Sequence, residues 1–270
     1  MAELYWLGQM GLIIKSKETK ICIDYFATQT AERRIAPPLA TEGLADVDAF
    51  LGTHNHLDHI DHEAWKIWTR AFPHAKFIFG ETHRKEVLDD GVAPENAIGL
   101  NDGESVKVGD MTIHAIAAAH EFLEMDEATG LYPHLQYIVE ADGVKIHHAG
   151  DTLRYEGMLA KLKAFGHIDA ELLPINGRDA RRYTRGCIGN MTFQEAADLA
   201  GEVAPTVAIP GHWDMFADNG ADPKEFADYL EAKYKGKVAC RIPKIMERIT
   251  VWPETAGHPP GVLFHRLSRR

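Results

Sequence analysis

The segment that most constrains this chain is residues 53–62, THNHLDHIDH, which holds four histidines and two aspartates. Residues 47–51 (VDAFL) before it predict a buried strand, and the spacing of residues 63–68 after it predicts a helix with Asp61 as its N-cap. The polar cluster is therefore expected on a loop between a strand and a helix, where side chains converge. Neutral imidazole and carboxylate groups bind divalent Zn, Mn and Fe, so the segment predicts a site for one or two such ions.

Three further polar residues follow predicted strands later in the chain. They are His120 after a hairpin at 104–118, Asp151 after a hairpin at 134–148, and His212 after a strand at 206–210. Each of them is expected at a strand end, as the cluster in residues 53–62 is.

The His-x-His-x-Asp-His pattern of residues 54–59, with the later positions in this order, resembles the metallo-β-lactamase superfamily of metal-dependent hydrolases. The resemblance covers nearly the whole chain and implies a single domain over residues 1–270. It implies an α+β fold, a four-layer αββα sandwich. It also implies a centre for one or two divalent ions, with Mn, Zn and Fe all open. The implied ligands are His54, His56 and His120 for one ion, Asp58, His59 and His212 for the other, and Asp151 between the two.

The resemblance gives roles to three aspartates. Asp24 ends the third of three short strands predicted within residues 4–24, where an aspartate also suits a turn. In the family, an aspartate at this place orients the metal-binding histidines. Asp58 and Asp151 are the implied catalytic residues: Asp151 bridges the ions, and Asp58 takes part in proton transfer when a metal-activated hydroxide attacks the substrate.

Within the superfamily, residues 5–11 (YWLGQMG), 53–61 and 209–212 are similar to the L-ascorbate-6-phosphate lactonases and their small relatives. This similarity implies hydrolysis of a lactone or ester bond in a small metabolite, with or without a phosphate group. The chain departs from those lactonases, which carry a long N-terminal extension, and around His120 it is closer to the small relatives. The substrate therefore stays open. Two alternatives also stay open: a phosphodiesterase or nuclease on the same dinuclear site, and a non-catalytic metal-binding protein.

Charge and composition bear on these alternatives. The chain has 40 acidic and 29 basic residues and a net charge of -11, which disfavours a broad surface for nucleic acid or an anionic membrane. The expected partner is a small-molecule substrate, and the sequence does not decide whether the chain forms homo-oligomers. No apolar run approaches the ~18 residues of a membrane span, and residues 1–5 do not resemble a signal peptide.

The cysteines are three in number and far apart: Cys22, Cys187 and Cys240. An odd number without metal-like spacing predicts free thiols that take no part in the reaction. This usage is typical of a reducing compartment, so a cytoplasmic location is expected.

Four arginines and a tyrosine lie together in the turn-rich residues 176–186, after a strand predicted at 168–174: Arg178, Arg181, Arg182, Tyr183 and Arg185. Guanidinium groups bind phosphate through paired hydrogen bonds and stay charged at neutral pH. We expect at least one of these arginines, together with the tyrosine, to hold an anionic group of the substrate, most simply a phosphate. The alternative is a solvated loop whose arginines pair with nearby acidic residues.

Overall fold

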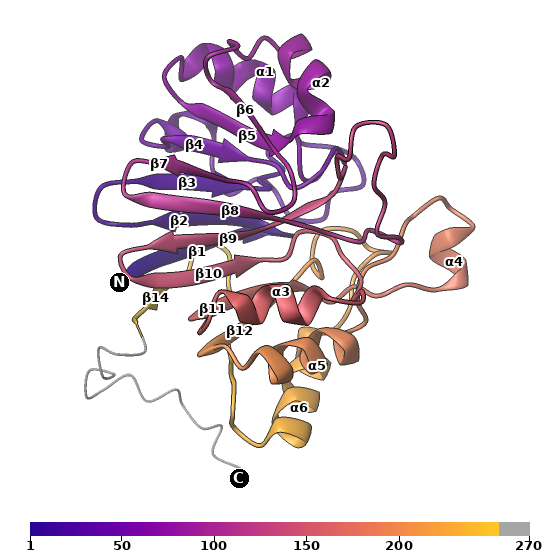
Figure 1. Cartoon of the computed structure of the whole chain (residues 1–270). Helices are drawn as coiled ribbons and strands as arrows, with labels where there is room; N and C mark the ends of the chain where they lie inside the picture. Colours follow the sequence, from indigo (N-terminus) through magenta and orange to yellow (C-terminus); the bar gives the residue numbers. More distant parts are fainter. Residues whose placement is uncertain (254–270) are drawn as a thin grey trace.

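The computed structural model describes residues 1–253, and in it two seven-stranded sheets pack face to face with helices on both outer faces (Figure 1). In order across the first sheet, the strands are β14 (Arg248–Val251), β1 (Ala2–Gly8), β2 (Gly11–Lys15), β3 (Lys20–Ile23), β4 (Ala49–Leu51), β5 (Lys76–Gly80) and β6 (Ala97–Leu100). In order across the second, they are β13 (Ala239–Cys240), β12 (Val207–Gly211), β11 (Ala170–Pro174), β10 (Val144–His148), β9 (Leu135–Ala141), β8 (Met111–Ala117) and β7 (Ser105–Val108). The predicted αββα sandwich is confirmed. Residues 254–270 of the predicted domain lie outside the described residues.

Both sheets change from antiparallel to parallel pairing partway across. Strands β1 to β3 are antiparallel and β3 to β6 are parallel, while β7 to β10 are antiparallel and β10 to β13 are parallel. Parallel neighbours end at the same edge of a sheet, and two antiparallel steps return β8 to the direction of β10. As a result β3 and β4 end together in one sheet, and β8, β10 and β12 end together in the other.

The space between the sheets is filled by apolar side chains that alternate along the strands, as expected for sheets with one face turned to a shared core. Trp6 and Ile78 of the first sheet and Tyr137 and Leu172 of the second belong to this layer and are almost fully buried. The hydroxyl of Tyr137 donates a hydrogen bond of 2.8 Å to the carbonyl of Gly52. That bond joins the second sheet to the chain just before the predicted metal-binding loop.

The outer face of the first sheet is covered by α1 (His62–Ala71) and α2 (Arg84–Asp89), with short 3-10 turns at η1 (Thr41–Leu44) and η2 (Glu81–His83). Trp68 of α1 stacks on Phe50 of β4 with 4.6 Å between ring centroids. Asp61 is the N-cap of α1, as predicted, and accepts a 3.1 Å hydrogen bond from the backbone of Ala64. This cap marks the end of the polar loop and the start of the helix.

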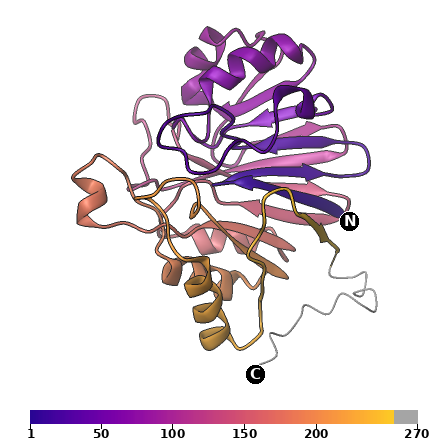
Figure 2. The same ribbon diagram turned by 180° about the vertical axis from the view of Figure 1, so that it is seen from behind.

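The outer face of the second sheet is covered by α3 (Met158–Ala164), α5 (Phe193–Val203) and α6 (Pro223–Tyr234). A short helix, α4 (Ala180–Tyr183), lies in a segment that projects away from the sandwich (Figures 1 and 2). The sequence patterns did not predict α3 or β6, because each is too short to show a clear period. Within residues 1–253, no helix is both long and apolar enough to cross a membrane.

Candidate metal centre

The polar loop after β4 is folded tightly against the start of α1. At Gly52, an added Cβ would lie 2.2 Å from a side-chain carbon of Ile60, so only glycine fits there. The backbone amides of His59 and Ile60 both donate 2.9 Å hydrogen bonds to the carbonyl of His56. This turn bends the chain back on itself and brings the side chains of His54, His56 and His59 toward one place.

The first cluster consists of His54, His56 and His120, each of which offers a ring nitrogen within 4.8 Å of the other two. Nε2 of His54 and Nδ1 of His56 lie 2.9 Å apart. Two nitrogens bound to one zinc ion at 2.0–2.1 Å are about 3.3 Å apart, so the separation is close to that of a shared ligand sphere. Burial and the neighbouring His59 hold the pKa of His54 well below its ordinary value, and burial lowers the pKa of His120 to about 4. Both rings are therefore neutral at pH 7, the form that binds metal.

The second cluster consists of Asp58, His59 and His212, with ligand atoms again within 4.8 Å of one another. Asp58 Oδ2 lies 3.6 Å from Nε2 of each histidine. Gln9 holds this arrangement, since its side-chain amide donates a 2.7 Å hydrogen bond to the same oxygen and lies 3.1 Å from His212 Nε2. The backbone amide of His212 also donates to the carbonyl of Gln9 at 2.9 Å.

Asp151 lies between the two clusters. Its Oδ1 is 3.3 Å from His59 Nε2, and its Oδ2 is 3.1 Å from His212 Nε2 and 3.7 Å from His120 Nε2. Gly150 allows this approach: its φ is +57°, and an added Cβ would lie 2.9 Å from the side chain of Thr53. Oδ2 thus lies near a histidine of each cluster and Oδ1 lies near His59, so this carboxylate is placed to bridge the two clusters.

Charge in the centre is divided unevenly. Burial alone would lower the pKa of His59 and His212, but Asp151 and the other nearby carboxylates raise both values above the ordinary one. Burial alone would raise the pKa of Asp151, but His212 and His59 hold it well below the ordinary value. Without metal, imidazolium ions neutralise the carboxylates. A divalent cation bound at the second cluster therefore has to displace protons from His59 and His212.

Asp24, at the end of β3, fixes the orientation of His59. The aspartate is fully buried, and its Oδ2 accepts a 2.6 Å hydrogen bond from His59 Nδ1 and a 2.7 Å bond from the hydroxyl of Thr53. Its Oδ1 accepts a 2.8 Å bond from the backbone amide of Thr53. Because this bond keeps one proton on Nδ1 of His59, the proton that a bound cation displaces is the one on Nε2, which faces the centre. These contacts agree with the orienting role expected for Asp24.

Several buried polar atoms of the centre have no hydrogen-bond partner among residues 1–253. They include Nε2 of His59, Nδ1 of His120 and Oδ1 of Asp151. His59 Nε2 and Asp151 Oδ1 face each other at 3.3 Å as an ion pair without a hydrogen bond, and bound divalent cations would give these atoms direct partners. The donor atoms are imidazole nitrogens and carboxylate oxygens without sulfur. The residues present therefore fit one or two divalent ions, and the chemistry of the donor set suits Zn, Mn and Fe alike.

The structure adds two residues that sequence reasoning did not assign to the site, Gln9 and His134. Gln9 lies in the opening turn at residues 5–11, whose similarity to known lactonases was a usable signal. Gln9 has a φ of 55° and His212 has a φ of 56°, so both bonded partners hold uncommon left-handed backbone. No sequence pattern indicated that His134 lies at the site, because it stands far from the candidate ligands in the sequence and directly precedes an ordinary strand.

The arginine-rich segment is mostly engaged within the protein. Arg178 forms an ion pair with Glu195 at 2.6 Å, and Arg185 pairs with Asp218 at 3.0 Å. Arg182 donates to the backbone carbonyls of Asn176 and Gly220. Among these arginines, the side chain of Arg181 alone makes no hydrogen bond or ion pair within residues 1–253, and it is exposed. Three of the four side chains therefore serve first to hold the projecting segment in shape.

The three cysteines are free thiols in the structure. Burial raises the pKa of Cys22, and burial raises the pKa of Cys240 to about 12. The pKa of Cys187 is also raised, by burial first and then, after an opposing effect of Arg182, by Asp151 and Asp58. All three are protonated and weakly nucleophilic at neutral pH, so their predicted lack of a chemical role is consistent with their surroundings.

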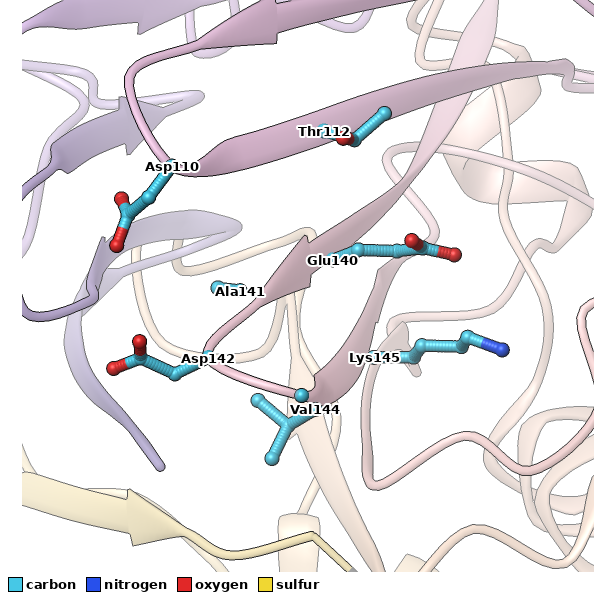
Figure 3. A pocket seen from close by; sticks show the side chains of 8 residues that line it. Asp110, Thr112, Glu140, Ala141, Asp142, Val144 and Lys145 are labelled. Carbon is cyan, nitrogen blue, oxygen red and sulfur yellow. The ribbon is translucent and has the colours of Figure 1, made fainter.

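A shallow hollow of about 240 Å³ lies at the opposite edge of the second sheet, at the turns that join β7 to β8 and β9 to β10 (Figure 3). It is lined by Asp110, Thr112, Glu140, Ala141, Asp142, Gly143, Val144 and Lys145. Since β8 and β10 begin at these turns, the hollow is separated from the metal-binding edge by the length of the strands. None of the predicted site residues lines it.

Two buried clusters of histidine and aspartate, bridged by a carboxylate at one edge of an αββα sandwich, define a metal-dependent hydrolase. Residues 19–213 match the family model described as "Beta-lactamase superfamily domain", and the chain belongs to this family. The predicted membership of the metallo-β-lactamase superfamily is thus confirmed.

Relatives and solved structures agree with this membership. The chain is 26% identical over 231 residues to a UPF0173 protein of Pyrococcus furiosus, covering 86% of this chain and 91% of that protein. It is 27% identical over 269 residues to a protein of Salmonella heidelberg named probable L-ascorbate-6-phosphate lactonase, covering 85% of this chain and 74% of that protein. A metallo hydrolase from Ignicoccus hospitalis has the same fold, with a TM-score of 0.71 and 23% identity over 92% of this chain and 97% of that one.

Proposed function

We propose that this metal-dependent hydrolase opens the ester bond of a lactone or a related small carboxylic ester. The observation that supports the proposal is the position of Asp151, whose carboxylate lies near histidines of both candidate ligand clusters. The similarity to a protein named as a lactonase, at 27% identity, supports the substrate class. The net charge of -11 disfavours an extended nucleic-acid substrate for the same centre.

The chain's own residues would divide the work as follows. When bound, divalent ions polarise an ester carbonyl and lower the pKa of water, which supplies a nucleophile near neutral pH. Asp58 Oδ2 is occupied by the amide of Gln9, which leaves Oδ1 as the atom to accept a proton from the attacking water. Asp24 keeps the proton of His59 on Nδ1, away from the reaction. Gln9 and Asp24 therefore fix the donor atoms before substrate arrives, which is how preorganised sites lower a barrier.

A phosphate on the substrate is a narrower form of the proposal, and it now depends mainly on Arg181. The other arginines of the segment already have partners, so binding phosphate through them requires breaking existing contacts. If Arg181 holds a phosphate, Arg181→Ala lowers kcat/KM for a phosphorylated lactone by about tenfold to a hundredfold, the equivalent of one charged hydrogen bond. The same variant leaves kcat/KM for the unphosphorylated lactone unchanged. Equal effects on the two substrates would leave the phosphate without a binding residue in this segment.

The test of the proposal is a substrate panel with purified, metal-loaded protein. Simple and phosphorylated sugar lactones represent the proposed class, and bis-p-nitrophenyl phosphate represents phosphodiesters. Lactone hydrolysis that is lost on chelation supports the proposal. Preferential hydrolysis of bis-p-nitrophenyl phosphate would instead indicate a phosphodiesterase or nuclease that uses the same centre. Absence of turnover on both classes in fully loaded protein would favour a metal-binding protein without catalysis.

A further inference from the structure

His134, the residue just before β9, lies beside the first histidine cluster without belonging to it. Its ring centroid is 5.3 Å from that of His54, 5.4 Å from that of His120 and 6.4 Å from that of His56. The imidazole thus borders all three rings of the cluster.

The backbone around His134 is held from three sides. Its carbonyl accepts a 2.8 Å hydrogen bond from the amide of Ala118, and the amide of Leu135 donates a 3.0 Å bond to the carbonyl of Thr53. The carbonyl of Pro133 accepts a 2.7 Å bond from His83 Nε2. The backbone that carries the ring is therefore held by segments that follow strands of both sheets and by η2.

The ring nitrogens of His134 have no hydrogen-bond partner within residues 1–253, and Nδ1 is buried. Nε2 of His59 and Oδ1 of Asp151 are also buried without a hydrogen bond, and both belong to residues that are candidate metal ligands. Each orphaned buried atom in a native structure requires an explanation, and for His134 a metal ion is not one. Its nitrogens join none of the clusters whose ligand atoms lie within 4.8 Å of one another. A group that arrives with the substrate would supply the missing partner.

We propose that His134 contacts the substrate beside the first histidine cluster and donates a hydrogen bond to an oxygen of the bound ester or of its hydrolysis product. The imidazole of His134 has an N–H donor, and its buried Nδ1 has no hydrogen-bond partner within residues 1–253. Such a donor stabilises the negative charge that develops on an oxygen during acyl transfer. The inference rests on the proposed esterase or lactonase activity of the centre, and it adds a catalytic residue that lies outside the ligand set.

The experiment compares the parent with His134→Phe and His134→Gln, and uses His114→Phe as a matched control. His114 is a half-buried histidine on β8 whose ring faces Phe165 and Glu140, away from the centre. Zinc binding to metal-free protein and inorganic phosphate binding to zinc-loaded protein are measured by calorimetry. The values of kcat and KM are measured on p-nitrophenyl acetate and on a simple lactone.

The expected result is specific to the substrate side of the centre. In His134→Phe, zinc affinity stays within about twofold of the parent, phosphate binds about tenfold more weakly, and kcat falls about a hundredfold. His134→Gln, which keeps an N–H donor, recovers part of both losses, and His114→Phe matches the parent. Parental kcat and phosphate affinity in His134→Phe would overturn the inference. Loss of zinc together with activity would also overturn it, because His134 would then support the metal ligands.

Failure of the proposed function can be told apart from failure of this inference. If the zinc-loaded parent hydrolyses neither the ester nor the lactone, the proposed function fails. The phosphate affinities of the parent and of His134→Phe then test whether His134 binds an oxyanion. If the parent hydrolyses both substrates and His134→Phe does so equally well, only the inference fails. A loaded parent that binds no phosphate also counts against it, since an N–H donor next to bound cations should attract an oxyanion.

Discussion

Replacing Asp24 by asparagine tests how the fold selects the metal-binding form of His59. Asp24 receives three hydrogen bonds: from the amide of Thr53 at 2.8 Å, from its hydroxyl at 2.7 Å and from His59 Nδ1 at 2.6 Å. An asparagine has almost the same shape but only one acceptor oxygen. With that oxygen kept on the amide of Thr53, the new NH₂ group faces His59 Nδ1. The imidazole then has to accept a bond there and carry its proton on Nε2, which faces the centre.

The magnitude follows from this change of tautomer. Removal of such an orienting partner typically costs 10–100-fold in metal affinity, or about 1.4–2.7 kcal/mol. We expect Asp24→Asn to weaken zinc binding at the cluster of Asp58, His59 and His212 by this factor. Zinc binding at the cluster of His54, His56 and His120 should be nearly unchanged, because Asp24 makes no hydrogen bond with any of those three rings.

The assay is competition for zinc between metal-free protein and a chromophoric chelator at pH 7, which resolves two binding steps. Asp169→Asn is the control, since Asp169 is a buried aspartate that accepts a 2.8 Å bond from the backbone of Lys145, at the other end of the second sheet. The control should lose stability and keep both zinc affinities. Two parental binding steps in Asp24→Asn would refute the reasoning that Asp24 sets the protonation of His59.

Three further predictions concern the whole centre. Chelation should abolish hydrolysis and added divalent metal should restore it; full activity in protein shown by elemental analysis to be metal-free would contradict the metal-dependent mechanism. Asp151→Ala removes a carboxylate that lies within 4 Å of histidines of both clusters, and it should lower metal content below two ions and kcat by at least about a hundredfold. Normal metal content and turnover would remove Asp151 from the centre. Metal-free protein should lose stability as the pH falls from 6.5 to 4, because folding lowers the pKa of His120 to about 4 and the unfolded chain then binds more protons in this window. His120 alone contributes up to about 3 kcal/mol of this loss, and urea denaturation at pH 6.5 and 4.5 that gives equal unfolding free energies would contradict it.

The convergence of side chains within residues 54–59 could be predicted because it follows largely from local geometry. A strand, a tight turn and a capped helix are determined by neighbouring residues and bring His54, His56 and His59 close together, while Asp24 of β3 fixes the orientation of the His59 ring. The strand-end positions of His120, Asp151 and His212 were also predictable from hairpin and strand patterns. The resemblance to a known superfamily assigned them to a common centre, since local pattern does not say which strand ends meet.

Local pattern was silent wherever a long-range contact decides what a side chain does. His62 belongs to the same histidine-rich segment, yet its ring bonds to Asp90 and Asn55 and takes no part in the clusters. His134, with no motif around it, borders the centre because pairing of β9 with β8 places it there. The positions of these two histidines in the sequence therefore do not show which of them borders the centre.

The arginine-rich segment shows the same limit. Four guanidinium groups in eight residues favoured anion binding, but Glu195, Asp218 and two backbone carbonyls take up three of them in the folded chain. The sequence by itself determined the chemistry of the centre and the order of its elements, because these follow from residue type and short-range geometry. The tertiary structure alone decided which polar groups remain free for a ligand, because that depends on partners far away in the chain.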